Sequence, residues 1–358
     1  MFANSQVGKF SSLVYNKYIY KKESRSSMKN IRFFICVIMA ALITCSALGA
    51  ESGTEAGVSP SAEVQASGQA ESSTAAYGET EAVDPHEPFI AYVSGVDTRA
   101  EELEQSNGDV NILMVVNPQT RNILLLNTPR DYYIKNPAGG NAMDKLTHCA
   151  VYGIENSEKA LGQLYGCDVN YYMQVNFEGF KKIIDAIGGV SVYSSETFSA
   201  GGYDFVEGYN DMDGDKALVF ARDRYDVAYG DNGRGRNQMR VIEAVIQKIF
   251  DDPSCLDQNM DELLEGLGGT LETDIPVLTV FTMITDHVSD SESAQPLNVH
   301  EYAVTGHNGI DKTWSMEEPT NVMYQDPDLV AHASDLIQKV LDGENLTDDM
   351  VGEIVQEW

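Results

Sequence analysis

The chain has 358 residues, enough for one large domain or two ordinary ones. It contains 24 Lys and Arg against 55 Asp and Glu, which gives a formal net charge of -31 at pH 7. Hydrophobic residues make up 43% of the chain, too large a share for a wholly disordered protein. Because so acidic a surface repels nucleic-acid phosphates, the composition argues against DNA or RNA binding.

The charge is distributed unevenly along the chain. Residues 1–50 carry seven basic residues and one acid, whereas residues 51–358 carry 17 basic and 54 acidic residues, a net charge of -37. The 18 uncharged residues at 33–50 would span about 27 Å as a helix, close to the thickness of a bilayer core. All nearby Lys and Arg precede this run, which predicts a cytoplasmic segment at 1–32 and a body outside the cell membrane.

Two interpretations of residues 33–50 stay open. The run is either a retained single-pass transmembrane helix, which we favour, or a cleaved signal segment that ends in small residues near Ala47 and Ala50. The true start is either Met1 or Met28, since translation from Met28 would give a short basic segment before the run. Both interpretations place residues 51–358 on the extracytoplasmic side.

The segment at 51–88 is predicted to be a disordered acidic linker. It is rich in Ser, Ala, Gly, Glu and Thr and contains no Lys or Arg. Large apolar residues are too few to offset the entropy of ordering the chain.

Three cysteines, Cys149, Cys167 and Cys255, lie in the body. An odd number excludes a full disulfide framework. A single bridge between Cys149 and Cys167 stays open in an oxidising, secreted setting, although free thiols are favoured.

Residues 89–305 are predicted to form one α/β domain. Apolar, β-prone runs bounded by turn residues predict strands at 89–96, 111–116, 123–127, 171–175, 189–193 and 297–304. Helical patterns are found at 158–165, 177–187, 214–221, 237–250, 277–287 and 328–341. This alternation predicts a three-layer α-β-α sandwich, and the short link between the second and third strands makes the central sheet mixed. Residues 306–358 are expected to be a C-terminal helical extension with a frayed tail from Asp342.

The strongest chemical signal is a cluster of arginines. Five of the eight in the body lie within 19 residues: Arg222, Arg224, Arg234, Arg236 and Arg240. In one interpretation they pair with neighbouring Asp residues on a solvated face. In the other they form a site for a strongly anionic group, because a guanidinium donates two parallel hydrogen bonds to phosphate.

The local pattern around these arginines bears on the second interpretation. If the chain leaves a helix after Ala221 in extended form, Arg222 and Arg224 point the same way. Arg234 and Gln238 are four residues apart and share one face where the next helix begins. The first turn of that helix adds free N–H groups and a positive dipole end.

Two further signals lie at predicted strand ends. Asp97 ends the first strand and Asp109 precedes the second, so their carboxylates could converge on Mg²⁺. The ordinary alternative, a turn or cap role for each Asp, is favoured when these residues are taken alone. Arg130, in the segment Pro129-Arg130-Asp131, is either presented at the end of the third strand or an incidental turn residue. The sequence contains no GxSxG motif, P-loop or dinucleotide fingerprint.

In this order the segments resemble the LytR-CpsA-Psr family of bacterial cell-envelope proteins. The stretches that carry the resemblance are GVDTR (95–99), GDVNILMVVNP (108–118), LLLNTPRDYYI (124–134), DKLTHCAVYG (144–153), VNYYMQVNFEGFKKIIDAIGGVSV (169–192) and GDKALVFARDRYDVAYGDNGRGRNQ (214–238). They cover most of residues 89–250. The resemblance implies a family domain at 89–305 and a membrane topology that suits the N-terminal run.

The resemblance also implies a phosphotransferase reaction in cell-wall biogenesis. An anionic glycopolymer, such as a teichoic acid or capsular polysaccharide, passes from an undecaprenyl-pyrophosphate carrier to peptidoglycan. Two alternatives stay open: a lipid-pyrophosphate phosphatase that uses water as acceptor, and a non-catalytic polyprenyl-phosphate-binding regulator of the transcriptional-attenuator type. Action on nucleic acid is disfavoured by the charge of the body.

Site residues follow from the resemblance position by position. Asp97 and Asp109 match the family's ligands for Mg²⁺ or Mn²⁺. The residues that match its pyrophosphate-binding and catalytic positions are Arg130, Arg222, Arg224, Asp231, Arg234 and Gln238. Those expected near the head group are Arg99, Lys145 and Arg236. The family's apolar tunnel for the lipid tail matches Phe177, Phe180, Ile183, Ile184, Ile187, Phe220 and Val245, although an ordinary core role is favoured for most of these.

Two departures from the family pattern concern activity. Asn107 and Asn237 stand where many family members have Arg. Arg236 could reach the region of the second missing arginine, but a shift of one residue turns a helical side chain by about 100°. The departures leave the polymer and the rate open.

Overall fold

A computed structural model of the chain describes residues 84, 86–96, 103, 106–252, 255, 269–275, 283 and 297–352. The expected membrane segment, most of the linker, the tail beyond 352 and nearly all of the helix expected at 277–287 lie outside the described residues. Asp97 and Arg99 also lie outside them. Within the described residues, no helix combines the length and the apolar character needed to cross a membrane.

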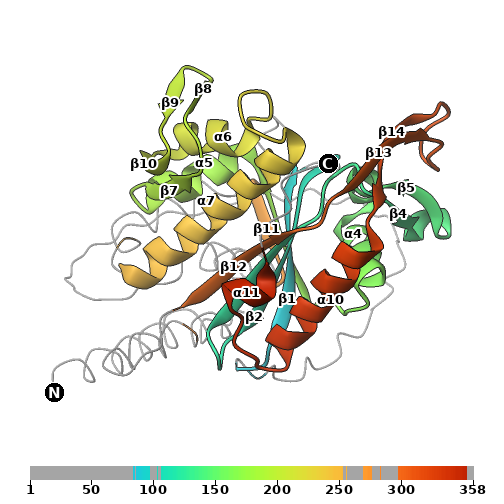
Figure 1. Cartoon of the computed structure of the whole chain (residues 1–358), viewed down its shortest axis with the longest axis horizontal. Coiled ribbons are helices and arrows are strands. Elements are labelled where there is room, and N and C mark those ends of the chain that lie inside the picture. Colours follow the sequence, from blue (N-terminus) through green and yellow to red (C-terminus); the bar gives the residue numbers. More distant parts are fainter. Residues whose placement is uncertain are drawn as a thin grey trace, which may run out of the picture.

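A six-stranded mixed sheet forms the centre of the molecule (Figure 1). Its strands, in spatial order, are β11 (Leu271–Thr273), β6 (Tyr171–Asn176), β1 (Phe89–Val96), β2 (Gly108–Asn117), β3 (Asn122–Asn127) and β12 (Asn298–Ala303). The pairs β1–β6 and β3–β12 are parallel, whereas β1–β2, β2–β3 and β6–β11 are antiparallel. The prediction of a mixed sheet is confirmed.

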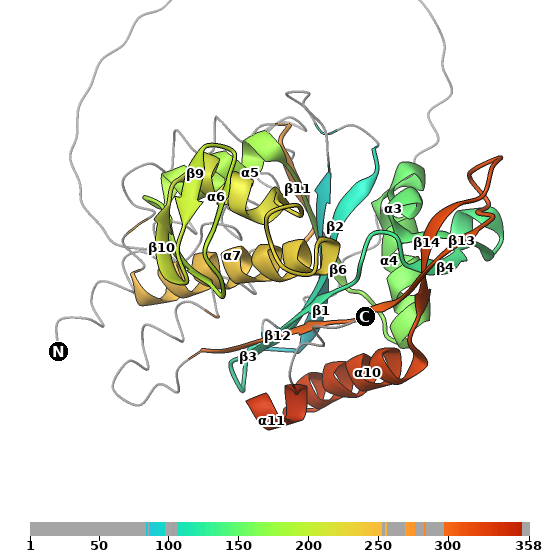
Figure 2. The ribbon, with the colours of Figure 1, turned by 45° about the horizontal axis from the view of Figure 1, so that its top comes forward.

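One face of the sheet is covered by α5 (Phe177–Ala186), α6 (Gly214–Arg222) and α7 (Asp231–Asp251) (Figure 2). Alternate sheet residues such as Ala91, Ile112 and Leu125 pack into this apolar layer. Gly235 lets α7 approach the sheet closely, because a Cβ there would lie 2.4 Å from Nδ2 of Asn127 at the end of β3. The beginning of α7 therefore lies over the carboxyl end of β3.

The opposite face is covered by α3 (Leu146–Cys149), α4 (Ile154–Tyr165), α10 (Pro327–Leu341) and α11 (Asp348–Val351) (Figure 2). Tyr92, Leu113 and Leu126 point into this second layer. Both faces of β1–β3 are thus buried, which explains their nearly continuous apolar sequences. The three-layer α-β-α arrangement is confirmed.

The prediction of a frayed tail from Asp342 is wrong for the described residues. Leu346 and Val351 are buried in the second apolar layer. The backbone carbonyl of Leu346 lies 3.1 Å from Nε2 of His300 and accepts a hydrogen bond from Asn298. Apolar anchors separated by acidic residues hold this segment on β12 despite its charge.

Four short antiparallel ribbons complete the fold, and most of their strands were not predicted. Their members are β4 (Tyr133–Asn136) with β5 (Ala142–Lys145), β7 (Val190–Ser194) with β10 (Gly208–Met212), β8 (Phe198–Ala200) with β9 (Tyr203–Phe205), and β13 (Gly306–Asp311) with β14 (Thr320–Gln325). Residues 306–358 were expected to form a helical extension, but this part of the chain begins with the β13–β14 hairpin at residues 306–325. Polar, Gly-rich strands of three to six residues carry little periodic signal.

Two short single turns, η2 (Pro137–Gly139) and η3 (Ala150–Tyr152), link these elements. The helices at 154–165 and 231–251 begin earlier than predicted, by four and six residues. Cys149, Cys167 and Cys255 are free thiols, so the open question of a Cys149–Cys167 bridge is answered in the negative.

Candidate functional site

A cavity of about 410 Å³ lies between the sheet and the layer formed by α5, α6 and α7. Most of its wall is apolar. The apolar wall includes Val93, Val110, Met114, Met173, Val175, Phe177, Phe180, Ile183, Ile184, Leu218, Val241, Ile242, Val245 and Ile246. Its polar wall consists of Asp109, Arg130, Asn176, Arg222, Arg224, Tyr225, Arg234 and Gln238. The cavity is suited to an amphiphile with an anionic head and a hydrocarbon tail.

A β-bulge places Asp109 in the polar wall. Gly95 pairs with Val110 and Val96 pairs with Gly108, so Asp109 is the extra residue between two registers. A bulge leaves its extra residue unpaired and re-aims its side chain, as it does here toward the cavity. Asp97 follows Val96 directly, so the backbone of β1 leads to the same end of the sheet, where the bulge of β2 lies. Asp97 itself is not described.

Arg130 follows the end of β3 and reaches the same end of the sheet as Asp109. Its Nη1 donates a hydrogen bond to Oδ1 of Asp109 at 2.9 Å. Burial acts to lower the pKa of Arg130, but the hydrogen bond and the charge of Asp109 outweigh it and raise the pKa. Nε of Arg130 is buried and has no hydrogen-bond partner among the described residues. An anionic oxygen at the cavity would satisfy this donor.

Arg222 and Arg224 leave the end of α6 together. The helix ends at Arg222, and Asp223 is extended, with φ -66° and ψ 137°, as the alternation of the two arginines requires. The Arg222 guanidinium lies 4.0 Å from the centre of the Phe177 ring, and Nη2 of Arg224 donates to the Tyr225 hydroxyl at 2.8 Å. Within the described part of the chain, neither arginine forms an ion pair with a carboxylate. The solvated salt-bridge interpretation is therefore wrong for these two residues.

The first turns of α7 supply the remaining polar wall. Gly230 precedes the helix with φ 55°, a conformation that favours glycine. Nη2 of Arg234 lies 2.5 Å from Oδ1 of Asp231, and Gln238 donates from Nε2 to the Ala221 carbonyl at 3.2 Å. Burial lowers the pKa of Arg234, Asp231 opposes the shift, and Arg130 adds to it. Arg130 and Arg234 are therefore near enough to repel each other, and an anion bound at the cavity would relieve this repulsion.

Lys145 and Arg236 lie beside the site rather than in the cavity wall. Nζ of Lys145 lies 2.9 Å from Oδ1 of Asp131, the residue that follows Arg130. Arg236 is buried and its guanidinium lies 5.1 Å from the centre of the Tyr229 ring. It therefore does not take the place of an arginine at Asn237, whose amide donates to the Phe220 carbonyl.

The cavity divides the seven apolar residues matched to the lipid tunnel. Phe177, Phe180, Ile183, Ile184 and Val245 line it. Ile187 and Phe220 are fully buried in the core instead. Ile183 and Ile184 are also buried in the core, and Phe180 and Val245 pack against it, so lining the cavity and a core role are combined in these residues. Tyr225, Leu218 and Ile242 also line the cavity and were not singled out, because nothing in a local pattern marks which buried face borders a void.

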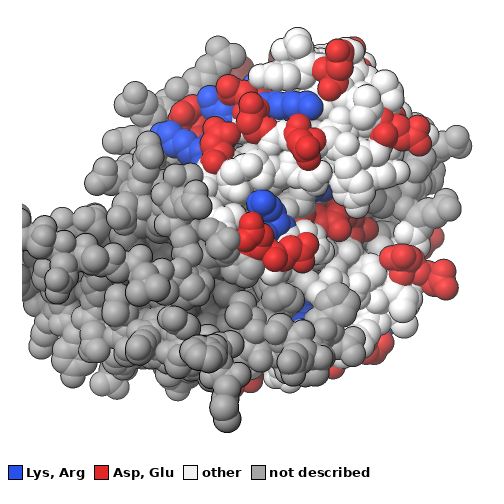
Figure 3. All heavy atoms as spheres, turned by 90° about the vertical axis from the view of Figure 1, so that its left-hand side faces the viewer, with Lys and Arg blue, Asp and Glu red and all other residues white. Residues whose placement is uncertain are grey.

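Several basic residues of the helical layer outside the cavity wall are paired with carboxylates. On the face shown in Figure 3, basic side chains lie among acidic ones. Ion pairs on α5–α7 include Lys181 with Glu178, Lys181 with Asp215, and Lys248 with Asp252. Such exposed pairs contribute little to stability and leave no free cation for a ligand.

No group of three or more His, Cys, Asp or Glu side chains that could hold a metal occurs within the described residues. Asp109 alone brings a carboxylate to the cavity wall there. Mg²⁺ is commonly bound by one or two carboxylates together with waters and phosphate oxygens, so Asp109 supplies one such ligand and a second carboxylate would complete the set. The position of Asp97 after Val96 is compatible with that role.

Fold and site together define an α/β protein with a cavity between its sheet and one helical layer, and the lining of that cavity is suited to an anionic amphiphile. The LytR_cpsA_psr family model matches residues 56–327, well over half of the chain. The chain belongs to this family.

Two curated relatives carry the name polyisoprenyl-teichoic acid--peptidoglycan teichoic acid transferase TagU. The protein from Oceanobacillus iheyensis is 33% identical over 60% of this chain and 68% of its own length. The protein from Enterococcus faecalis is 34% identical over 53% of this chain and 62% of its own length. The matches thus span about two thirds of the length of these relatives.

Solved structures share the fold. Bacillus subtilis TagU superposes with a TM-score of 0.54 and 23% identity, covering 73% of this chain and 99% of that one. A structure of TagT bound to LI-WTA superposes with a TM-score of 0.56 and 22% identity, covering 74% and 95%.

Proposed function

We propose that the chain transfers an anionic glycopolymer from an undecaprenyl-pyrophosphate carrier to peptidoglycan in cell-wall biogenesis. One observation carries the proposal: four arginines line the polar part of a cavity whose wall is otherwise mostly apolar. A polyprenyl pyrophosphate has this division, with a doubly charged head and a hydrocarbon tail. The names of the relatives, teichoic acid transferases, support a teichoic acid as the polymer.

The residues of the site suit phosphoryl transfer without a covalent enzyme intermediate. A hydroxyl of peptidoglycan attacks the phosphorus that carries the polymer, forming a phosphodiester. The P–O bond of the pyrophosphate bridge breaks, undecaprenyl phosphate leaves, and the hydroxyl proton passes to a base. Arg222, Arg224 and Arg234 neutralise the charge that develops on the bridging and leaving oxygens. Arg234 is buried, so less water screens its charge, which strengthens this effect at that position.

A divalent cation, Mg²⁺ or Mn²⁺, is part of the proposal. Asp109 and Asp97 would hold it, since both come from neighbouring strand ends and supply the hard oxygen ligands that such cations prefer. When bound, the cation supplies further neutralisation of the pyrophosphate charge.

We also propose that residues 33–50 anchor the protein in the cell membrane, with the body on the extracytoplasmic side. The basic residues before that run support this orientation. Protease added to intact protoplasts should digest the body, and full protection of the body would overturn this topology.

The transfer itself is tested with the full chain in detergent. The protein is incubated with a lipid-pyrophosphate oligosaccharide, peptidoglycan oligomers and Mg²⁺, and the products are identified by mass spectrometry. Transfer yields lipid monophosphate together with a phosphodiester-linked adduct. Lipid monophosphate without an adduct would identify a pyrophosphatase instead, and binding without any product would identify a non-catalytic lipid-binding protein.

A further inference from the structure

An exposed aromatic surface is formed by η3 and the segment that follows β13. Tyr152 of η3 and Trp314, after β13, have 44% and 43% of their area exposed. Their ring centroids are 5.0 Å apart with an angle of 45° between the planes. Val151 and Met316 are also exposed beside them in the chain. Exposed aromatic rings of this size, grouped from two distant segments, are typical of a binding surface.

This surface, here called the Tyr152–Trp314 surface, is held rigidly. The backbone N–H of Trp314 donates to the Met143 carbonyl at 2.9 Å. Its indole packs flat against η2, since a Cβ on Gly139 would lie only 2.6 Å from the ring. Rings fixed before binding lose little conformational entropy when a ligand stacks on them.

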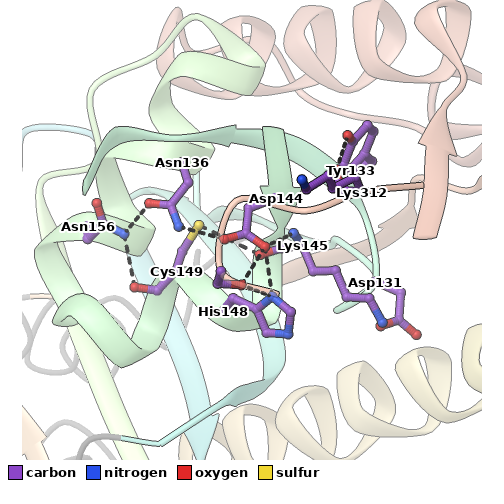
Figure 4. Close-up of polar contacts among 10 residues, drawn as sticks. Asp131, Tyr133, Asn136, Asp144, Lys145, His148, Cys149, Asn156 and Lys312 are labelled. Carbon is purple, nitrogen blue, oxygen red and sulfur yellow. Dashed lines mark hydrogen bonds and ion pairs between the residues drawn. The ribbon is translucent and has the colours of Figure 1, made fainter. Parts of the chain in front are cut away.

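Ser315, the residue after Trp314, holds this segment in place through hydrogen bonds. The Ser315 hydroxyl donates to Oδ1 of Asp144 at 2.9 Å and lies 2.7 Å from Nδ1 of His148. Asp144 is fully buried and accepts a further hydrogen bond from Asn136, as Figure 4 shows. The Tyr133 hydroxyl donates to the Lys312 carbonyl at 2.7 Å, so the β13–β14 hairpin is fastened to β4 and β5 at several points (Figure 4).

Strand β5 connects this surface to the candidate site. Met143, which binds the backbone of Trp314, is two residues from Lys145 on β5, about 7 Å along an extended strand. Lys145 pairs with Asp131, and Arg130 beside it reaches the cavity. The surface and the arginines are thus connected through β5 and the Lys145–Asp131 ion pair.

We propose that the Tyr152–Trp314 surface binds the uncharged face of a glycan strand, the acceptor in the transfer. The inference rests on the proposed function and adds where the acceptor lies. The C–H groups on one face of a sugar ring carry a slight positive charge and stack on the negative face of an aromatic ring. Glu317 and Glu318 are exposed next to Met316, which disfavours the anionic glycopolymer as occupant.

Trp314 gives the proposal a direct readout. The chain has two tryptophans, Trp314 and Trp358, so a Trp358→Phe background leaves Trp314 as the only indole. The full-length protein in detergent is titrated with a β-1,4-linked N-acetylglucosamine hexasaccharide, an uncharged probe, while indole emission and calorimetric affinity are measured. Polyglycerol phosphate serves as the anionic probe.

A saturable change in indole emission with the uncharged probe is expected. Trp314→Ala and Tyr152→Ala should each weaken calorimetric binding at least tenfold, whereas Trp314→Phe should retain part of it. Tyr209→Ala, which removes an exposed tyrosine from β10, is the matched control and should bind as the parent does. Thermal melts identify any variant that fails to fold. If Trp314→Ala does not fold, the binding measured for Tyr152→Ala tests the proposal.

Two results would overturn the inference: no saturable binding of the uncharged probe, or equal binding by the parent and the Tyr152→Ala variant. Tighter binding of polyglycerol phosphate at these rings would reassign the surface to the donor polymer. Failure of the proposed function is distinguished separately, because lipid-pyrophosphate affinity does not require the acceptor. A variant of this surface should lose adduct formation while retaining the parent's affinity for the lipid pyrophosphate, whereas the parent protein itself would form no adduct if the proposed function were wrong.

Discussion

Arg130 and Asp109 form a hydrogen-bonded ion pair of 2.9 Å that joins the end of β3 to the bulge of β2. The two residues are 21 positions apart in the sequence. Both strand ends are needed to hold the guanidinium at the cavity. The pair occupies one oxygen of Asp109 and one nitrogen of Arg130. The buried Nε of Arg130 has no hydrogen-bond partner among the described residues and lies 4.0 Å from Oδ2 of Asp131. The site is therefore built partly from interactions that fix its charges before any substrate binds.

The arginine positions at the end of α6 give the first prediction. Arg222→Ala and Arg224→Ala should each lower transfer and lipid-pyrophosphate affinity at least tenfold, because a charge-assisted hydrogen bond contributes roughly 1.5–3 kcal/mol. Arg→Lys should restore only part of the loss, since an ammonium cannot donate two parallel hydrogen bonds. The measurements are turnover and affinity for the lipid.

Arg121→Ala is the matched control for these variants. Arg121 lies before the first residue of β3 and Arg130 lies beyond its last, so six strand residues, about 20 Å, separate the two ends. All of these arginines carry the same charge, and a general electrostatic role would make them equivalent. Equal losses at Arg121, Arg222 and Arg224 would contradict a specific head-group site, as would losses that thermal melts trace to unfolding.

Strand and helix positions with strong apolar periodicity could be predicted from the sequence. The strand at 89–96 has the expected bounds, and the extended residue after α6 places Arg222 and Arg224 on one wall as expected. The beginning of α7 was missed because Asp231 to Arg236 contains two glycines and no apolar residue. Its first turns are nonetheless buried against β3, so tertiary contacts override low intrinsic helix propensity.

Three-dimensional details of the site could not be predicted from local patterns. The bulge at Asp109 depends on a register between two strands, and the ion pair with Arg130 depends on a third. Arg236 precedes Asn237, the position where many family members have Arg, but its guanidinium lies over the Tyr229 ring instead. The rings of Tyr152 and Trp314 meet across 162 residues of chain, a contact that no periodicity indicates.

The second prediction concerns the metal. Asp109→Asn should keep the hydrogen bond to Arg130 but weaken Mn²⁺ or Mg²⁺ binding about tenfold or more, because an amide oxygen lacks the carboxylate charge. Asp97→Asn should have the same effect. Mn²⁺ binding followed by electron paramagnetic resonance in the presence of lipid pyrophosphate measures it independently of turnover. Asp226→Asn, an exposed residue of the α6–α7 loop, is the control. Unchanged Mn²⁺ affinity in both site variants would refute the proposed ligands.

The third prediction concerns the apolar cavity. Val245→Phe adds an aromatic ring to a wall of the 410 Å³ space and should weaken binding of long polyprenyl pyrophosphates roughly tenfold. A short-chain analogue with the same head group should bind almost as it does to the parent, because the arginines are unchanged. Val206→Phe, at an exposed position, is the control. A loss that is the same for both chain lengths would show that the ring disturbs the head-group site rather than the tail site.

The fourth prediction concerns Glu301, which lies on β12 below α7. Burial raises its pKa from 4.5 to about 8, the carboxylate of Glu243 adds to the shift, and Arg240 and Arg236 oppose it. Oε1 of Glu301 has no hydrogen-bond partner among the described residues. The folded protein therefore holds a proton that the unfolded chain releases above about pH 4.5, and stability falls as pH rises from there to about 8.

Glu301→Gln should remove this pH dependence. The variant should match the parent near pH 4.5 and become more stable than the parent by ~1 kcal/mol or more at pH 8–9, a rise in melting temperature of about 2–4 °C. Thermal melts across this pH range measure the difference. Glu317→Gln, at an exposed position between β13 and β14, is the control and should leave the slope unchanged. A parallel pH profile for parent and Glu301→Gln would show that Glu301 ionises normally in the folded protein, with its charge accommodated by Arg236 and Arg240.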